Sequence, residues 1–282
     1  MKMVKKMGKK ITTENKEKWA LVTGGSSGIG MELAKLLAKD GYSLVIVAKP
    51  QEELDRAKAW FDKNMPDTKF VFRQQDLALQ ESAQAVYDFT SQNGYDIEIL
   101  CNNAGFGCFG WHYDLNLDRV ADMINLHVYT NWKLNRLYLK DMVEKDCGRI
   151  LITSSGMGFT PGPKFAAYAA TKAFSYYYGM GIEEELRLLK SKVSVTILCP
   201  APTNTGFAKA ADMEDSKSFD PKSKLLKEPD FVAKKAYKAL KKRKRMVSPA
   251  GPLMGIMVKV MFPMARVSRV VMMLKIAKFM SD

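Results

Sequence analysis

The sequence predicts a single α/β domain in which a doubly wound parallel sheet carries helices on both faces. Three observations support this fold class. From Trp19 onward, short apolar runs of β-strand character alternate with longer stretches of helical periodicity, which is typical of βαβ units. The first apolar run leads directly into a glycine-rich turn and a helix. The 282 residues suffice to bury one large core, and no internal repeat interrupts the pattern.

Strands are expected where short apolar runs are bounded by polar, Gly or Pro positions. In chain order, six strands are predicted at residues 20–22, 43–47, 69–73, 97–101, 149–153 and 194–198, with a possible short seventh strand at 246–248. Because a helical stretch separates consecutive strands, they are expected to pair in parallel through crossover connections.

Helices are expected where apolar residues recur at spacings of three and four. They are predicted at residues 29–39, 52–64, 81–92, 117–144, 165–190 and 230–241. Residues 200–227 are predicted to be irregular. They follow the sixth strand, at the carboxyl edge where such sheets place their ligand loops.

Charge is distributed unevenly along this chain, whose formal net charge is +14. Residues 1–18 carry seven Lys against two acidic residues, residues 222–282 carry sixteen basic against three acidic residues, and the part between them is mildly acidic. A nucleic-acid-binding protein usually carries its basic surface on the folded domain, so no nucleic-acid partner is expected. The chain is therefore divided into a basic leader at 1–18, a folded domain at 19–250 and a basic, Met-rich tail at 251–282.

The amino-acid composition and the two terminal segments also indicate the cellular compartment and whether the protein binds a metal. The four Cys include no Cys-x-x-Cys pair and only two His are present, so free buried thiols and no metal site are expected. The leader lacks the apolar run of a signal peptide, which favours a cytoplasmic protein. Charged residues and Pro263 interrupt the tail, so it is not expected to span a bilayer. It remains open whether the tail lies on an anionic membrane, covers a lipophilic substrate or seals a subunit interface.

The turn after the first strand has the order strand, glycine-rich loop and helix that a Rossmann-type dinucleotide site requires. Its spacing is Gly-x-x-x-Gly-x-Gly. Glycines let the backbone approach the pyrophosphate, and the helix N-terminus offers free N–H groups. The predicted cofactor contacts here are Gly24, Ser26, Ser27, Gly28, Ile29 and Gly30.

Cofactor preference is predicted from the ends of the second and third strands. The second strand ends in Ala48-Lys49, with no acid to bind a ribose 2′-OH and with a base that can meet a 2′-phosphate, so NADP(H) is favoured over NAD(H). Asp76 and Leu77 follow the third strand. Asp76 either accepts from the adenine amino group or caps the following turn.

Five motifs in this order resemble those of the short-chain dehydrogenase/reductase family, over about residues 19–210. They are the segments 23–30, 102–105, 168–172 and 200–205, together with Ser155. Segments 102–110 and 161–163 are most similar to the branch that contains 3-oxoacyl reductases and hydroxysteroid dehydrogenases. The resemblance implies a homo-oligomer paired through the long helices. It also implies that the cofactor contacts Asn103, Ala104, Gly105, Pro200, Thr203 and Thr205.

The expected chemistry is acid–base catalysis beside a hydride transfer. Tyr168 and Lys172 lie four apart on a predicted helix and therefore on one face, where the ammonium can lower the pKa of the phenol and bind the nicotinamide ribose. Ser155 matches the family serine that holds the substrate oxygen. Ser154 is the alternative, but strand alternation points the two serines to opposite sides.

Two departures from the family pattern bear on activity. The family's catalytic Asn on the central helix is replaced by His127, and Asn125 lies about 200° round an α-helix from it. His127 either keeps a proton relay and adds a titratable group, in which case His127→Asn changes the pH profile, or is a packed histidine with no relay role. Ala201 replaces the usual Gly after Pro200.

The loops around the expected carbonyl position are apolar and aromatic, which favours a lipophilic ketone or alcohol. These residues are Phe106, Phe109, Trp111, Met157, Phe159, Phe165 and Phe207. His112 is either a group that orients the substrate or a surface imidazole. The predicted function is NADP(H)-dependent oxidoreduction of 3-oxoacyl-like or hydroxysteroid-like compounds. The alternative is a catalytically weak NADP(H)-binding regulatory or scaffold protein at a membrane surface.

Overall fold

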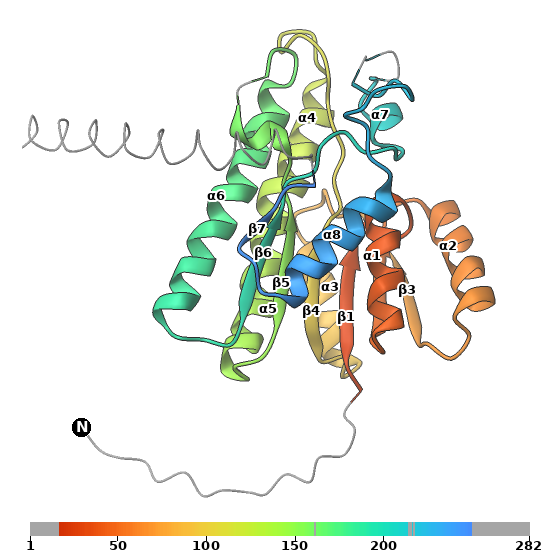
Figure 1. Ribbon diagram of the computed structural model, residues 1–282, viewed down its shortest axis with the longest axis vertical. Helices are drawn as coiled ribbons and strands as arrows, with labels where there is room; N and C mark the ends of the chain where they lie inside the picture. Colours follow the sequence, from red (N-terminus) through yellow and green to blue (C-terminus); the bar gives the residue numbers. More distant parts are fainter. Residues whose placement is uncertain (1–16, 161, 214–215, 217, 250–282) are drawn as a thin grey trace, which may run out of the picture.

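Seven parallel strands form one sheet in the computed structural model, which describes residues 17–160, 162–213, 216 and 218–249 (Figure 1). Their spatial order is β3-β2-β1-β4-β5-β6-β7. Because the order reverses between neighbours β1 and β4, the connections that leave these strands diverge and open a crevice at the carboxyl edge. The strands are β1 (Trp19–Thr23), β2 (Ser43–Ala48), β3 (Phe70–Gln74), β4 (Ile97–Asn102), β5 (Arg149–Thr153), β6 (Ser194–Leu198) and β7 (Met246–Val247).

Helices cover both faces of this sheet. One face carries α1 (Gly28–Lys39), α2 (Gln51–Asn64) and α8 (Pro229–Lys241), and the other carries α3 (Ser82–Gln92), α5 (Asn131–Glu144) and α6 (Ala166–Leu188). Shorter helical segments are α4 (Leu117–Ile124), the π-helical η1 (Asn125–Thr130), the 3-10 turn η2 (Gly156–Phe159) and α7 (Phe207–Ala210).

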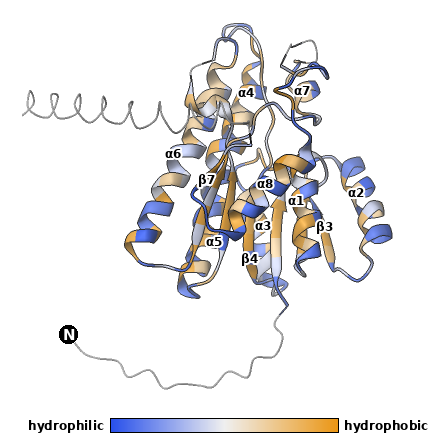
Figure 2. Ribbon diagram, in the orientation of Figure 1, coloured by the Kyte–Doolittle hydropathy of each residue, from blue (hydrophilic) through white to orange (hydrophobic). Residues whose placement is uncertain are grey.

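Strand alternation divides the buried side chains between two cores. In β1, Trp19 and Leu21 pack beneath α3, α5 and α6, while Ala20 and Val22 pack beneath α1, α2 and α8. Figure 2 shows the consequence as apolar strands enclosed by helices with hydrophilic outer sides. A sheet that is buried on both faces provides the rigid edge on which a site can be built.

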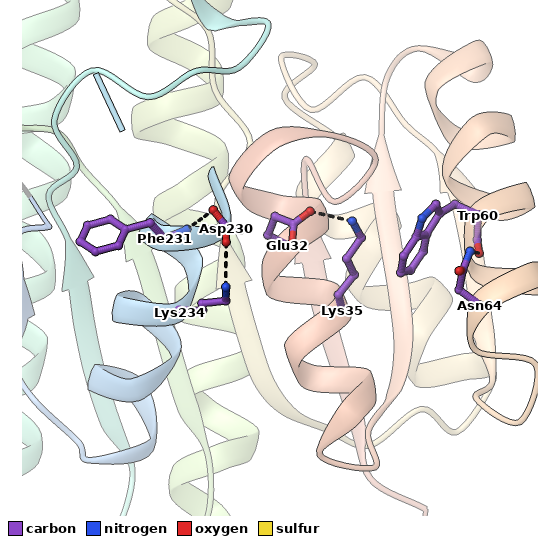
Figure 3. A network of polar contacts seen from close by, with 7 residues as sticks. All are labelled: Glu32, Lys35, Trp60, Asn64, Asp230, Phe231 and Lys234. Atoms are coloured by element: carbon purple, nitrogen blue, oxygen red, sulfur yellow. Dashed lines mark hydrogen bonds and ion pairs between the residues drawn. The ribbon is translucent and has the colours of Figure 1, made fainter. Parts of the chain in front are cut away.

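Polar contacts at the surface lie within α1 and within α8, and one contact joins α1 to α2 (Figure 3). The Lys35 ammonium on α1 lies 2.6 Å from Oε1 of Glu32 and 4.1 Å from the centroid of the Trp60 ring on α2. On α8, Asp230 accepts from the Lys234 ammonium at 2.7 Å. Exposed pairs of this kind add little stability, but the stacking of Lys35 on Trp60 holds the C-terminal half of α2 against α1.

The structure confirms the predicted fold class and the predicted strands to within two residues at each end, including the short seventh strand. It differs inside the helix predicted at 117–144, where η1 widens the helix around His127, and in the loop predicted at 200–227, which contains α7. Cys147 is exposed, whereas the other three free thiols are buried as expected.

The predicted leader at 1–18 lies almost wholly outside the described residues, and the tail at 251–282 lies entirely outside them. Pro161, part of a segment that supported the branch assignment, is also outside them. Within the described part of the chain, no helix is long and apolar enough to cross a membrane.

Candidate active site

A cavity of about 1290 Å³ opens at the carboxyl edge of the sheet, at the switch between β1 and β4. The glycine-rich turn after β1 lines one end, and aromatic side chains line the other. Of the predicted cofactor contacts, the cavity is lined by Gly24, Ser26, Ser27, Gly28, Ile29, Lys49, Asp76, Leu77, Asn103, Ala104, Gly105, Tyr168, Lys172, Pro200, Thr203 and Thr205. Gly30 is not part of this lining.

The glycine-rich turn needs its glycines for close backbone approach. Gly24 has φ +63°, and a Cβ there would lie 2.9 Å from the Cα of Ala104. A Cβ at Gly28, where φ is +53°, would lie 2.9 Å from the Thr205 side chain. Gly30 lets α1 pack closely against the glycine-rich turn, since a Cβ at this position would overlap the Gly24 carbonyl oxygen. The result is a backbone cradle at the N-terminus of α1 that leaves room for a pyrophosphate.

Lys49 and Asp76 pair with each other at this end of the cavity. The Lys49 ammonium lies 2.7 Å from Oδ2 of Asp76, and Oδ1 of the same carboxylate accepts from the Ala78 N–H at 3.0 Å. Burial raises the pKa of Asp76, but the Lys49 ammonium and the Ala78 N–H outweigh it and the pKa falls below its ordinary value. Asp76 therefore caps the turn after β3, which was one of its two predicted roles.

A residue that sequence reasoning missed, Glu53 on α2, also lines this end. Its Oε2 accepts from the Ser26 hydroxyl at 2.9 Å and from the Ser27 hydroxyl at 3.0 Å. The absence of an acid at the end of β2, on which the NADP(H) preference was predicted, therefore does not leave the region free of carboxylates. The signal that could have found Glu53 is its place in the first turn of a helix that starts beside the cofactor loop.

Asn103 joins the three strands behind the cradle. Its side-chain amide donates to the Thr23 carbonyl at 3.3 Å, and its Oδ1 accepts from the Thr153 hydroxyl at 3.3 Å. The Thr23 hydroxyl accepts from the N–H groups of Asn103 and Ala104, at 3.0 and 3.1 Å. These contacts hold the ends of β1, β4 and β5 in register beneath the middle of the cavity.

Tyr168, Ser155 and Lys172 meet at the centre of the cavity. The Ser155 hydroxyl hydrogen-bonds the Tyr168 side chain and accepts from the Met157 N–H at 3.1 Å. Ser154 donates instead to the backbone carbonyl of Lys172 at 2.7 Å. Ser155, and not Ser154, is the serine beside the phenol, as strand alternation predicts.

Burial governs the ionisation of Tyr168 and Lys172. It raises the pKa of Tyr168 to about 12, against a lowering by the Ser155 hydrogen bond, and it lowers the pKa of Lys172 to about 8. The expectation that Lys172 lowers the pKa of Tyr168 is not met in this structure. The ammonium donates to the Thr153 carbonyl at 3.1 Å and lies 5.7 Å from the centroid of the Tyr168 ring.

His127 is buried in η1 with both ring nitrogens engaged. Nε2 accepts from the Phe106 N–H at 3.2 Å, and Nδ1 lies 2.9 Å from the Thr171 hydroxyl, which itself donates to the Tyr168 carbonyl. This pattern requires a neutral ring that carries its proton on Nδ1. Burial and the Lys172 charge hold the pKa of His127 well below its ordinary value. The geometry favours the packed histidine over the titrating relay, and the ring joins the 104–106 loop to α6.

The segment after β6 closes the cavity from the opposite side. The Thr203 hydroxyl donates to the Ala201 carbonyl at 2.9 Å, and the Thr205 hydroxyl donates to the Thr203 carbonyl at 3.4 Å. Thr203 also bridges to Lys227, which fixes the start of the loop that leads to α7. Ala201 is buried and lines the cavity in the place of the family glycine.

Aromatic and apolar side chains line the end of the cavity beyond Tyr168. Six of the seven predicted ones lie there: Phe106, Phe109, Met157, Phe159, Phe165 and Phe207. Trp111 was predicted with them but is 53% exposed, outside the cavity lining that the described residues form, with Lys164 stacked 5.0 Å from its ring centroid. His112 is exposed and also outside this lining. Sequence reasoning missed Leu126, Met180, Met213 and Phe219.

Phe207, the first residue of α7, lines the apolar end of the cavity on the side of the 200–227 loop. Its ring centroid lies 5.5 Å from that of Tyr168 and 6.1 Å from that of Phe219. Arg119 on α4 donates to the Ala210 carbonyl and stacks 5.3 Å from the Phe106 ring centroid, so it ties α7 to the opposite wall. The site therefore combines a backbone cradle, a buried phenol beside a hydroxyl and an ammonium, and an apolar chamber.

Comparison with known proteins gives a consistent picture. Residues 18–216 match the family model described as short chain dehydrogenase. Over 175 residues the chain is 35% identical to the very-long-chain 3-oxoacyl-CoA reductase of Macaca fascicularis, which covers 60% of this chain and 54% of that protein. It is 33% identical over 175 residues to the 17-beta-hydroxysteroid dehydrogenase type 3 of Danio rerio, which covers 60% of this chain and 55% of that protein. The matched part of the chain thus spans about half the length of these curated relatives.

Solved structures are similar over most of the chain. A short-chain dehydrogenase from Sphingobium yanoikuyae in complex with NADPH superposes with a TM-score of 0.78 at 26% identity, over 91% of this chain and 95% of that one. A short-chain dehydrogenase/reductase from Burkholderia phymatum in complex with NAD superposes with a TM-score of 0.75 at 20% identity, over 89% and 95% of the two chains, and shows the same fold.

Proposed function

Because the chain belongs to the short-chain dehydrogenase family, in the branch of 3-oxoacyl reductases and hydroxysteroid dehydrogenases, we propose that it is an oxidoreductase of lipophilic carbonyls or secondary alcohols. The observation that carries the proposal is the position of Tyr168. Its phenol is buried beside the Ser155 hydroxyl, in a cavity with a glycine cradle at one end and aromatic walls at the other. A ketone or alcohol that enters the apolar end reaches this phenol.

The cradle supports a nicotinamide dinucleotide as the cofactor, with Gly24, Gly28 and the first N–H groups of α1 at its pyrophosphate. Thr203 and Thr205 would hold the carboxamide, and Lys172 the ribose. Lys49 supports NADP(H) as the preferred form. When bound, such a cofactor supplies or accepts the hydride.

The proton chemistry falls to this chain's own residues. Tyr168, whose pKa is raised to about 12, holds its proton at pH 7 and can give it to the oxygen of a carbonyl being reduced. The Ser155 hydroxyl positions that oxygen by a second hydrogen bond. Lys172, whose ammonium lies 5.7 Å from the Tyr168 ring centroid, is protonated below about pH 8 and is assigned to the ribose and not to lowering the pKa of the phenol. In the oxidative direction the same groups act in reverse.

The proposed activity is tested with purified protein, NADPH and NADH, and a panel of 3-oxoacyl-CoA thioesters and steroid ketones. Turnover of panel members with either cofactor supports the oxidoreductase. Tight binding of a dinucleotide without turnover of any panel member favours the regulatory or scaffold alternative instead.

We propose for His127 a positioning role, in which the neutral ring clamps the 104–106 loop to α6. The unfolded chain binds a proton at this imidazole below about pH 6.5, while the folded protein does so only at a lower pH. The free energy of unfolding should therefore fall as the pH decreases from 6.5 toward the folded pKa, by about 1.4 kcal/mol per pH unit. His127→Asn should lose this part of the slope, measured by urea unfolding between about pH 7.5 and about pH 5.

The chain offers a matched control, because its other histidine, His112, is exposed. His112→Asn should keep the wild-type dependence of stability on pH. The clamp also predicts that the shape of the pH–rate profile is the same in His127→Asn and in the wild type. A profile altered between about pH 6 and 8 would contradict the clamp and favour the relay.

We also propose that the basic C-terminal part brings the protein to an anionic membrane surface. Residues 252–282 carry five Lys and Arg against one acidic residue, among many Met and other apolar residues. Salt-sensitive binding to anionic vesicles that is lost on deletion of residues 252–282 supports this role of the proposed tail domain. Equal binding of the shortened chain would contradict it.

Homo-oligomerisation is likewise proposed, and sedimentation of the full chain tests it.

A further inference from the structure

Glu53 occupies the third position of α2, where a glutamate usually bonds back to the N–H of the residue that caps the helix. That residue here is Pro50, which has no N–H to offer. The carboxylate still lies favourably at the positive end of the helix dipole, but its usual local partner is missing. It reaches instead across to the loop between β1 and α1.

At that loop, one carboxylate oxygen takes two hydroxyl donors. Oε2 of Glu53 lies 2.9 Å from the Ser26 hydroxyl and 3.0 Å from the Ser27 hydroxyl. Ser27 sits at the N-cap of α1, yet its side chain does not cap that helix. Its hydroxyl is directed to Glu53, and the half-buried carboxylate faces the cavity beside the cradle.

The base at this end of the cavity is also held by a carboxylate. The Lys49 ammonium pairs with Asp76 at 2.7 Å, so the side chains that a ribose 2′-phosphate would use as donors, Ser26, Ser27 and Lys49, all bond carboxylates. Among the cavity-lining residues at this end, one base stands against two acids, Asp76 and Glu53. A phosphate dianion placed here meets a like charge on Glu53 and must displace it from both hydroxyls.

We propose that Glu53 is a specificity-determining residue that lowers the affinity of the site for the 2′-phosphate of NADP(H), by holding the Ser26 and Ser27 hydroxyls that the phosphate would bind. This inference rests on the proposed dinucleotide-dependent function. The ribose 2′-OH of NAD(H), in contrast, is uncharged and can donate to the same carboxylate. Glu53 thus makes the preference for NADP(H) smaller than Lys49 alone would give.

Glu53→Gln tests the proposal, because it removes the charge at almost unchanged size. It should lower the Kd of NADPH about tenfold and leave that of NADH within about twofold, since only the first ligand carries the repelled phosphate. Titration calorimetry with 2′,5′-ADP and 5′-ADP isolates the phosphate from the nicotinamide and from turnover. The same gain is expected for 2′,5′-ADP alone.

Glu52→Gln is the matched control, since Glu52 lies in the same helical turn and is exposed. It should leave the ratio of the two dissociation constants as in the wild type, which excludes a general effect of charge. Glu53→Asp provides a second variant, with the charge kept but its reach shortened. It should give a smaller gain in the same direction.

Two results would overturn the inference, and they differ in what else they overturn. If the wild type binds both dinucleotides and Glu53→Gln leaves their ratio unchanged, Glu53 does not determine specificity and the proposed function stands. If the wild type binds neither dinucleotide nor 5′-ADP, the proposed function fails together with the inference.

Discussion

Tyr168→Phe is expected to lower kcat for any accepted ketone about a thousandfold or more. The substitution removes a single oxygen, which in the proposed mechanism carries the proton to the substrate, and a positioned acid contributes about 10²- to 10⁴-fold. The ring remains to pack against Phe165 and Phe207, so the fold and dinucleotide affinity should change little. Steady-state kinetics and a binding titration on the same preparation measure both effects.

Tyr178→Phe is the control for this prediction. Tyr178 lies on the same helix and donates its hydroxyl to the Trp132 carbonyl at 3.3 Å, outside the cavity. This variant should retain wild-type kcat. Turnover by Tyr168→Phe at more than about a tenth of the wild-type rate would mean that another group, or solvent, supplies the proton.

Gly30→Ala is expected to destabilise the protein by about 3 kcal/mol and to abolish dinucleotide binding. The added Cβ would overlap the Gly24 carbonyl oxygen and lie 2.6 Å from Nδ2 of Asn103 and 2.7 Å from the Gly24 carbonyl carbon. The obstacle is mostly backbone, which cannot rotate away. α1 must therefore move off the turn, which destroys the cradle. Urea unfolding and a dinucleotide titration give the two effects.

A second helical glycine serves as the control. Gly181 on α6 is exposed, and a Cβ there would meet nothing within 4 Å. Gly181→Ala should stabilise the protein by about 0.5–1 kcal/mol, because Ala has the higher helix propensity. If both variants unfold at the wild-type urea concentration or above, α1 does not approach the turn as closely as described.

The sequence predicted the fold and the serine, tyrosine and lysine of the site because these depend on local pattern and on order along the chain. Strand runs such as 149–153 and 194–198 agree with the structure to the residue, since apolar runs and breakers are local signals. Ser155 was chosen by its match to the family serine, and strand alternation placed Ser154 on the opposite side. The glycine-rich turn was recognised by its spacing between strand and helix.

Other features depended on contacts between elements that no local pattern encodes. The approach of Glu53 to Ser26 and Ser27 follows from how α2 lies against α1, and the Lys49–Asp76 pair from how two strand ends meet. The direction of the Lys172 ammonium could not be inferred from a spacing of four residues. The π-helical turn at His127 also escaped prediction, because helical periodicity does not distinguish one wide turn within a long helix.

The structural role of Lys172 affects which site residues would be retained in related proteins that have lost catalytic activity. Its ammonium is buried and bonds the Thr153 carbonyl at the end of β5, so the side chain supports the architecture whether or not a reaction takes place. The Tyr168 hydroxyl hydrogen-bonds the Ser155 side chain, and within the described part of the chain this bond is made to a side chain and not to the main chain of a strand. In a lineage released from selection for turnover, we expect the lysine to persist while the tyrosine drifts to phenylalanine. Retention of the lysine alone is then a mark of common descent, and the tyrosine is the better indicator of a working enzyme.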